Sequence, residues 1–114
     1  YAACRAAYDE GEAWRKELIL RLRENRDLLQ TFVAQECPEV RLFPMQATYL
    51  AWLDLRELNL SNPTEHFERH GLGLSDGKMF GAPGFLRMNF GCPPKLLKEG
   101  LQRLKEGIQA CRKN

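Results

Sequence analysis

The sequence predicts an α+β fold in which helices cover one face of a small mixed or antiparallel sheet. Residues 12–36 and 94–111 carry apolar side chains at spacings of four and three, which is the pattern of amphipathic helices. Residues 47–55 and 85–90 are shorter apolar runs bounded by turn residues, as is typical of buried strands. A chain of 114 residues is long enough for one domain with a modest core, so we expect a single two-layer domain.

The long N-terminal helix is the most clearly patterned element. Its apolar stripe runs from Trp14 to Phe32, and the helix should end before Pro38, because proline disfavours helix in the residue that precedes it. A helix of about 25 residues is longer than a small domain needs for its own core. It either bridges to another domain or is a long surface helix, and the pattern leaves both open. Residues 1–7 are typical of a helix tail or a linker.

Two strands are expected after the long helix. Residues 40–44 form a short extended segment that is closed by proline. Residues 47–55 are rich in aromatic and apolar side chains, which predicts a central strand covered on both faces. Because side chains alternate along a strand, we expect Tyr49 and Trp52 to point to opposite faces, and most such aromatic residues belong to a core.

A short helix follows, with Asn62 as its N-cap, Pro63 at its first position and Gly71 at its end. His66 and His70 lie four residues apart on this helix, so their rings share a face. Two histidines at this spacing can bind zinc, but the glutamate of the metalloprotease motif and a third ligand are both missing. We therefore predict two surface histidines and no metal site.

The segment before the last strand is expected to be a short edge strand at residues 72–75, a turn and an open loop. The loop has glycines at positions 77, 81 and 84, which let a backbone approach a ligand closely. Their spacing is that of neither a P-loop nor a dinucleotide fingerprint. The loop is therefore a candidate for contact with a ligand of another kind.

Arg87 is the most informative residue of the chain. It lies in the last strand, where Phe85, Leu86, Met88 and Phe90 surround it. An arginine in a mostly buried strand needs an anion, because its guanidinium cannot lose its charge, and its planar donors suit a carboxylate or phosphate. The anion is either one of the chain's fifteen acidic residues, in a structural salt bridge, or the carboxylate of a ligand.

Composition excludes several functions. The net charge of +2 and the lack of an arginine-rich run or an aromatic RNA-binding signature argue against nucleic acid. We find no secretory signal and no apolar run near the roughly 20 residues that cross a bilayer, so we expect a soluble protein. The four cysteines have no paired spacing of a zinc or redox motif, which indicates small buried thiols in a reducing cytoplasm.

Several short motifs occur in order along the chain. They are Trp14, Asn25-Arg26-Asp27, Ala47-Thr48-Tyr49-Leu50-Ala51-Trp52-Leu53-Asp54, Leu74-Ser75-Asp76-Gly77, Phe80-Gly81, Gly84-Phe85, Arg87-Met88-Asn89-Phe90, Cys92-Pro93 and Leu97. Together they resemble the C-terminal small domain of pyridoxal-phosphate enzymes of the aspartate-aminotransferase superfamily, often described as class I and II aminotransferases. The most similar branch is that of the C–S β-lyases of the cystathionine β-lyase type. The resemblance covers essentially the whole chain.

The resemblance implies that residues 1–114 are the C-terminal small domain of a larger enzyme whose cofactor-binding domain is missing from the sequence. In such enzymes the arginine at the position of Arg87 binds the α-carboxylate of the amino-acid substrate. Asn89 alternates onto the same strand face and is expected to orient the guanidinium or to meet the ligand. Phe80 and Gly81 are expected on the loop at the mouth of the active site.

The implied activity is that of a C–S β-lyase, which converts a thioether amino acid to a thiol, ammonia and pyruvate; the alternative is an aminotransferase. Pyridoxal phosphate is expected in the parent protein, which should be a cytoplasmic homodimer. The six lysines of the chain lie on polar helix faces or in the open loop, without the buried setting that lowers a lysine pKa. We therefore expect no catalytic, cofactor-binding or metal-binding residue in this fragment, no bound cofactor, and no activity of the fragment alone. A first residue of Tyr1 rather than methionine fits a fragment.

Two other classes of protein are kept as alternatives. A free-standing α+β module could use the Arg87 loop to bind an amino acid or an acidic peptide. Such a module should hide the apolar stripe of its long helix in itself or in a homodimer, whereas an excised enzyme domain should expose it. An RNA-binding split βαβ domain is disfavoured by the balanced charge and the missing stacking motif.

Overall fold

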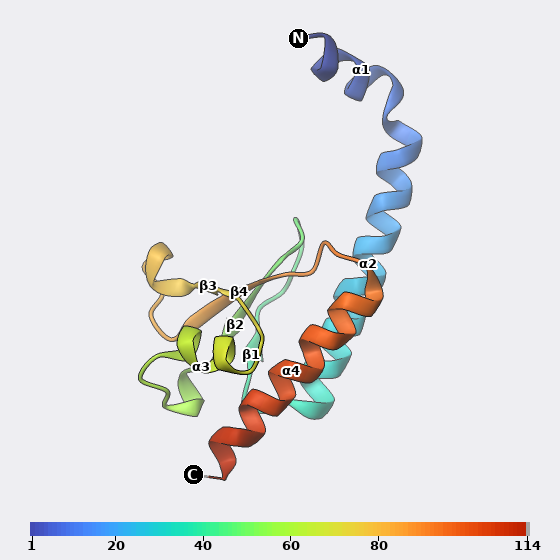
Figure 1. Cartoon of the computed structure of the whole chain (residues 1–114). Coiled ribbons are helices and arrows are strands. Elements are labelled where there is room, and N and C mark those ends of the chain that lie inside the picture. Colours follow the sequence, from blue (N-terminus) through green and yellow to red (C-terminus); the bar gives the residue numbers. More distant parts are fainter. Residues whose placement is uncertain (114) are drawn as a thin grey trace.

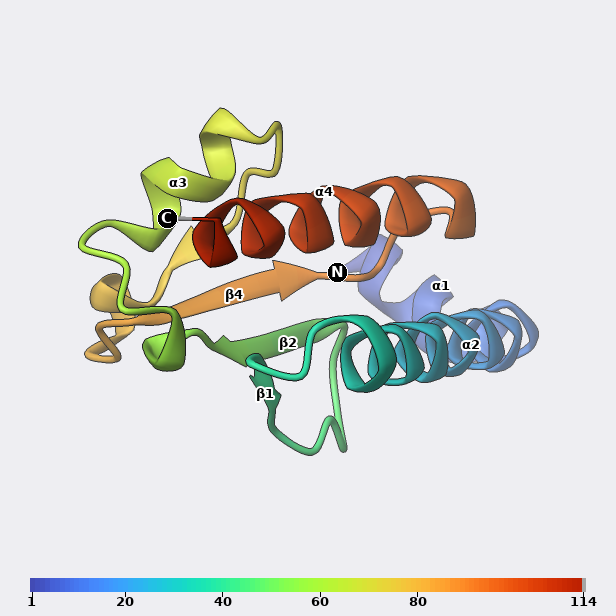
Figure 2. The same cartoon turned by 90° about the horizontal axis from the view of Figure 1, so that it is seen from below.

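The computed structural model describes residues 1–113 and has the α+β architecture that the sequence predicts. Its elements in chain order are α1 (Ala2–Glu10), α2 (Glu12–Glu36), β1 (Arg41–Leu42), β2 (Leu50–Asp54), η1 (Arg56–Leu58), α3 (Pro63–Arg69), β3 (Ser75–Asp76), η2 (Gly77–Phe80), β4 (Phe85–Asn89) and α4 (Pro94–Arg112). Within this part of the chain the strands form one sheet in the order β1-β2-β4-β3, and every neighbouring pair is antiparallel. The helices α2 and α4 lie side by side on one face of the sheet (Figure 1, Figure 2).

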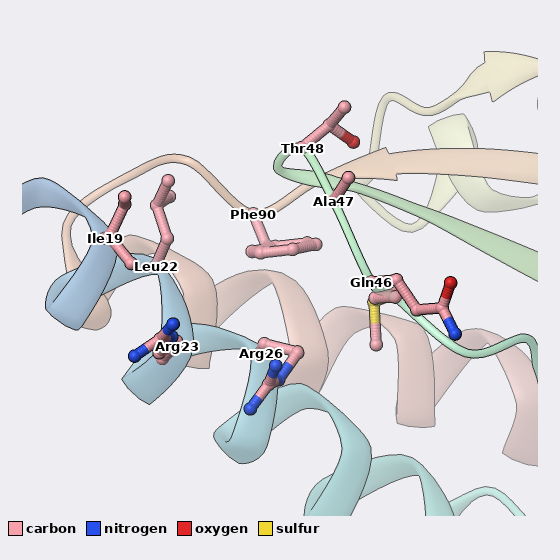
Figure 3. A pocket seen from close by; sticks show the side chains of 9 residues that line it. Ile19, Leu22, Arg23, Arg26, Gln46, Ala47, Thr48 and Phe90 are labelled. Atoms are coloured by element: carbon pink, nitrogen blue, oxygen red, sulfur yellow. The ribbon is translucent and has the colours of Figure 1, made fainter. Parts of the chain in front are cut away.

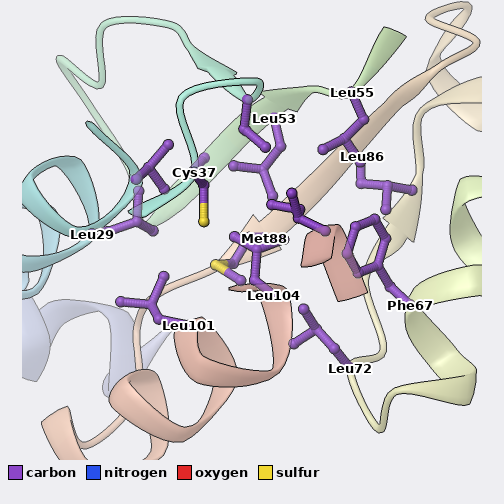
Figure 4. Close-up of a cluster of buried hydrophobic side chains, with 14 of the residues drawn as sticks. Leu29, Cys37, Leu53, Leu55, Phe67, Leu72, Leu86, Met88, Leu101 and Leu104 are labelled. Carbon is purple, nitrogen blue, oxygen red and sulfur yellow. The ribbon is translucent and has the colours of Figure 1, made fainter. Parts of the chain in front are cut away.

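The hydrophobic core lies between those two helices and the inner face of the sheet. Leu53 of β2 and Leu86 of β4 point into it and are fully buried, as are Leu29 of α2 and Leu104 of α4 (Figure 4). Phe67 closes the core at the α3 end. The alternation along β2 and β4 thus gives the sheet one buried face and leaves the other face for function.

The long helix has the bounds that its pattern predicts, and it leaves the domain at its N-terminal end. Its buried residues, Asn25, Leu29 and Val33, all lie in its second half. The first half and α1 extend away from the sheet, and no residue of α1 is buried (Figure 1). Residues 2–7 are therefore helical, which agrees with the first of the two alternatives that the sequence left open, a helix tail or a linker.

Asn25 fixes the angle at which α2 crosses the end of the sheet. Its side-chain amide donates to the carbonyl oxygen of Phe90 at 2.9 Å and to that of Cys92 at 2.8 Å. Both carbonyls belong to the connection between β4 and α4, where no strand or helix partner takes them. A polar residue in the middle of an apolar helix stripe is thereby satisfied in the core.

Three sequence-based expectations are wrong in detail. The face of β2 that carries Leu50 and Trp52 is only half-buried, so this strand is covered on one face and not on both. Tyr49 precedes β2. The edge strand is Ser75–Asp76 and not residues 72–75, because the chain from Gly71 to Leu74 runs beside α4 before it reaches β4.

The two histidines are half-buried rather than on the surface, because α3 packs on the C-terminal half of α4. His66 Nε2 lies 2.8 Å from the carbonyl oxygen of Gly107, and His70 Nδ1 lies 2.8 Å from that of His66. Each ring thus has a backbone partner. The Asn62 cap of α3 is confirmed, since its side-chain oxygen accepts the N–H of Glu65.

The cysteines agree in part with the expectation of buried thiols. Cys37 is fully buried, Cys92 and Cys111 are half-buried, and Cys4 is exposed. Burial raises the pKa of the Cys37 thiol to about 11 and also raises the pKa values of Cys92 and Cys111. These three thiols are protonated and unreactive near neutral pH. Among residues 1–113, no helix combines the length and apolar composition needed to cross a membrane.

Candidate functional site

Arg87 lies at the centre of the open face of the sheet. Leu86 and Met88 of β4 point into the core, so Arg87 between them points to the other face. Its cross-strand neighbours are Trp52 on β2 and Ser75 on β3. The middle row of the sheet thus reads Trp52, Arg87, Ser75, with the guanidinium on the side that α2 and α4 do not cover.

The guanidinium of Arg87 has no acidic partner within residues 1–113. None of the ion pairs in this part of the chain includes it, and its Nε is buried without a hydrogen-bond acceptor. A buried N–H donor without a partner costs free energy. The structural salt bridge that the sequence left open is therefore not formed, and the guanidinium is available to an anion from outside this part of the chain.

An aromatic ring takes the place of the missing acid. The guanidinium carbon of Arg87 lies 4.5 Å from the centre of the Phe80 ring, within the range of a cation–π contact. Phe80 in turn meets the ring of Trp52 edge-on, with centres 5.4 Å apart and planes at 86°. Phe80, Trp52 and Arg87 therefore form one contact group across η2, β2 and β4.

The loop that carries Phe80 is held by its own hydrogen bonds. The Asp76 carboxylate accepts the N–H of Lys78 at 2.9 Å and caps η2. Gly81 ends η2 in the left-handed region at φ 74°, which favours glycine. A Cβ on Gly77 would lie 2.3 Å from the carbonyl oxygen of Ala82, so a larger residue there would displace the loop. The glycines thus shape the turn that places Phe80 over Arg87.

Asn89 lies on the same strand face as Arg87, at the exposed end of β4. Its side-chain oxygen accepts the N–H of Gly91 at 2.8 Å. No hydrogen bond joins Asn89 to Arg87 among the described residues, so its proposed role toward the guanidinium or the ligand stays a prediction. Its amide NH₂ is not used by the bond to Gly91 and can donate to a ligand.

Asp54 lies on the same sheet face as Arg87, two residues beyond Trp52 on β2, and it is paired with another arginine. Its carboxylate oxygens accept from Arg56 Nε at 2.9 Å and from Arg56 Nη2 at 2.8 Å. This bidentate contact holds the pKa of Asp54 below its ordinary value. Because Asp54 is committed to Arg56, it does not neutralise Arg87 one row away.

Trp52 is the member of the site whose role the sequence did not single out, because a strand tryptophan is usually part of a core. Its position beside Arg87 depends on the pairing of β2 with β4, which are distant in sequence. The signal that could have found it is the alternation of side chains between the two faces of the strand. Ala51 and Leu53 on one face are smaller and apolar, whereas Trp52 on the other has a polar ring N–H suited to a half-buried face.

The candidate site is an open surface and not an enclosed cavity. A hollow of about 290 Å³ lies elsewhere, between α2 and the segment that leads into β2. Ile19, Leu22, Arg23 and Phe90 are among the side chains that line it, and Arg87 is not (Figure 3). Arg87 therefore needs further protein on the open face before a ligand can be enclosed.

The lysines of the described chain do not provide a Schiff-base site. Five of them are exposed, and the half-buried Lys105 forms an ion pair with Glu36. A Schiff-base lysine needs a buried or electropositive setting that lowers its pKa. The expectation that this chain holds no catalytic or cofactor-binding residue stays a prediction.

The comparison with known proteins decides the family. A model of the class I and II aminotransferases matches residues 1–104. The chain belongs to this family. The family resemblance read from the sequence motifs is thereby confirmed.

The relatives of this aminotransferase-family chain are long enzymes of which it matches a part. Cystathionine beta-lyase PatB of Bacillus subtilis is 32% identical over 111 residues, which are 93% of this chain and 29% of that enzyme. The crystal structure of OvoB is 41% identical, with a TM-score of 0.86 over 90% of this chain and 27% of that one. The PLP-bound C-S lyase from Staphylococcus hominis is 30% identical, with a TM-score of 0.86 over 90% of this chain and 29% of that one. The chain thus spans less than a third of the relatives it matches.

Proposed function

We propose that this chain is the substrate-carboxylate-binding small domain of a pyridoxal-phosphate-dependent C–S β-lyase of the cystathionine β-lyase type. The observation that carries the proposal is the guanidinium of Arg87, which is half-buried on the open sheet face under an aromatic ring and without an acid. The names of the relatives supply the reaction class, since a B. subtilis and a Corynebacterium glutamicum relative are both described as cystathionine beta-lyases.

The chain's contribution to catalysis would be orientation and charge. Pyridoxal phosphate, held by the rest of the protein, supplies the electron sink for cleavage of the bond to sulfur. The Nη nitrogens of Arg87 would donate to both oxygens of the substrate α-carboxylate. This bidentate contact would fix the position and the plane of the carboxylate and so set the direction of the α C–H bond. The aromatic group beside Arg87 would keep water from one side of this ion pair and so strengthen it.

The remaining two thirds of the protein would bind the cofactor and close the site. Three exposed apolar side chains, Tyr8, Trp14 and Leu18, lie on α1 and the first half of α2 and support a contact there with another domain. They weigh against a free-standing monomeric module, which should hide this stripe in itself. A homodimeric parent, a cytoplasmic location and the inactivity of the chain alone stay predictions.

The second candidate is the same role in an aminotransferase. It is supported by the family model and by a PLP-bound putative aminotransferase from Clostridium difficile 630, which is 31% identical with a TM-score of 0.83. Arg87 would bind the same carboxylate in both reactions. The side chain of the substrate and the fate of the cofactor distinguish them, and both lie outside this chain.

The test uses the full-length protein loaded with pyridoxal phosphate. Arg87→Ala should lower kcat/KM for cystathionine roughly 30- to 150-fold, the effect of about 2 to 3 kcal/mol expected when a charged hydrogen-bonding partner of the substrate is removed. Arg87→Lys should recover part of that loss, because it keeps the charge without the planar fork. Arg69→Ala is the matched control, since Arg69 pairs with Glu65 on α3 away from the open face.

The products separate the two reactions. Pyruvate released in a steady state identifies the lyase, whereas transfer of the amino group to a 2-oxo acid identifies the aminotransferase. An Arg87→Ala enzyme with unchanged KM and kcat in both assays would contradict the role of Arg87.

A further inference from the structure

We propose that Phe80 is a positioning residue for Arg87, holding the guanidinium by its face so that the in-plane donors stay free for the substrate carboxylate. This inference rests on the proposed function of Arg87 and adds how the chain keeps that arginine ready without an acid.

The contact places the guanidinium of Arg87 over an aromatic ring. The guanidinium carbon lies 4.5 Å from the centre of Phe80. An acidic neighbour would occupy two N–H donors in the plane of the guanidinium, as Asp54 does with Arg56. An aromatic neighbour stabilises the same charge through the face and uses none of these donors. The choice of ring over carboxylate therefore preserves the group that the substrate needs.

Phe80 packs against Trp52, which belongs to a longer aromatic row. Trp52 meets it edge-on at 5.4 Å, and Trp52 also contacts Phe85 at 6.5 Å and 74°. Phe43 extends this aromatic row, with its ring centre 6.1 Å from that of Phe85. The row runs along the open face of the sheet from the β1 edge to Arg87. Packing against this row therefore orients the ring of Phe80.

The loop behind Phe80 fixes its backbone. The N–H of Gly81 donates to the carbonyl of Lys78 at 3.1 Å, and that of Ala82 donates to the carbonyl of Gly77 at 2.9 Å. With the Asp76 cap, these bonds close η2 from both ends. Phe80 is nevertheless 46% exposed, so its ring contributes little to the core. A large exposed ring on a well-fixed turn is best explained by the charged group beneath it.

The other side chain of the turn provides a matched control. Met79 precedes Phe80 on η2 and is 79% exposed. It differs from Phe80 in that its side chain lies largely in solvent. Met79→Ala should therefore leave substrate binding unchanged, while it alters the same turn.

The experiment uses the full-length enzyme and measures how strongly it distinguishes a carboxylate from a neutral analogue. The probes are L-alanine and L-alaninamide as competitive inhibitors. The readout is the inhibition constant of L-alaninamide divided by that of L-alanine, which is large when the enzyme prefers the carboxylate. Phe80→Leu keeps the apolar volume and removes the π-face, and we expect it to lower this ratio roughly 3- to 10-fold, in the range of a partly shielded cation–π contact. Phe80→Tyr keeps the face and should restore the ratio to within about 2-fold of wild type.

A double variant separates positioning from packing. If Phe80 acts through Arg87, Phe80→Leu should have no further effect on the ratio in an Arg87→Ala background, because the group that it positions is gone. Additive losses, or a ratio that Phe80→Leu leaves unchanged, would overturn the inference while the loss in Arg87→Ala still supports the proposed function. A ratio that Arg87→Ala leaves unchanged would overturn both. Thermal unfolding of each variant identifies any that fail to fold, and Phe80→Met, which also lacks the π-face, then replaces Phe80→Leu in the comparison.

Discussion

At the scale of single residues, the chain treats its arginines in two ways. Arg56 and Arg112 are paired with the carboxylates of Asp54 and Glu39, and these contacts lower the pKa of each acid. Arg87 is stacked on a ring and has free donors. The first arrangement stabilises the fold, and the second keeps a charge available at the cost of a buried N–H without a partner.

The pair of Asp54 and Arg56 should make stability depend on pH on the acid side. The folded pKa of Asp54 lies below that of the unfolded chain, so the pair contributes stability that is fully present above the unfolded value and is lost as the pH falls through the folded value. Arg56→Gln should therefore destabilise the chain at pH 7 and have a smaller effect at about pH 3, below the ordinary aspartate pKa of about 3.9. Urea unfolding at the two pH values measures this.

The control for this prediction is Arg69→Gln, which removes an exposed pair on α3. It should change stability little at either pH, because exposed ion pairs contribute little. An equal loss at both pH values for Arg56→Gln would show that the stacking of Arg56 on Phe85, and not its charge pairing, supports the end of β2.

At the scale of elements, the close packing of α4 depends on where its glycines lie. Gly107 is buried and faces α3, where an added Cβ would lie 2.6 Å from the ring of Phe67. Gly100 is half-buried, and an added Cβ would meet only Leu72 Cδ1 at 3.7 Å, an ordinary contact. Glycine is thus required for the close packing of α3 at position 107, whereas at position 100 it only lowers the stability of the helix.

Alanine substitutions at these two positions should have opposite signs. Gly107→Ala should destabilise the chain by about 1 to 3 kcal/mol, because Phe67 is fully buried and must move. Gly100→Ala should stabilise it by about 0.5 to 1 kcal/mol through helix propensity. Urea unfolding of both variants checks this, and a stabilising Gly107→Ala would show that α3 can shift away from α4 at little cost.

The sequence predicts α2, α4 and β4 well, because each has its own periodicity and clear end signals such as Pro38 and Pro94. It predicts β3 poorly, since a strand of two residues has no alternation to detect. For the candidate site, the sequence singles out Arg87, Phe80, Gly81 and Asn89. The contact of Phe80 and the pairing of Arg87 with Trp52 require the order β1-β2-β4-β3, which brings together strands that are distant in sequence.

The absence of an acid at Arg87 is a second feature beyond sequence analysis. Fifteen acidic residues were available, and which of them approach the open face is decided by the packing of the whole sheet. Asp54 lies on the same sheet face, two residues from the cross-strand partner of Arg87, and it is paired with Arg56. This local pairing is visible only once the side chains are placed.

At the scale of the whole molecule, the chain is elongated and its two ends differ. It measures 55 × 28 × 24 Å, and the helices α1 and α2 account for the long axis (Figure 1). The core lies at one end, whereas Tyr8, Trp14 and Leu18 are exposed at the other. An apolar helix surface without a partner in its own domain is typical of an interface.

The exposure of Trp14 should depend on the rest of the protein. Trp14 is 69% exposed in this chain. In a Trp52→Phe background, acrylamide should quench the fluorescence of Trp14 strongly in the isolated chain. In the full-length protein the quenching constant of Trp14 should be lower by roughly threefold or more, because a domain contact excludes the quencher. Equal quenching would show that the α1 and α2 surface does not meet the larger part of the protein. Protection that grows with the concentration of the isolated chain would instead identify a homodimer of this domain and favour the free-standing module.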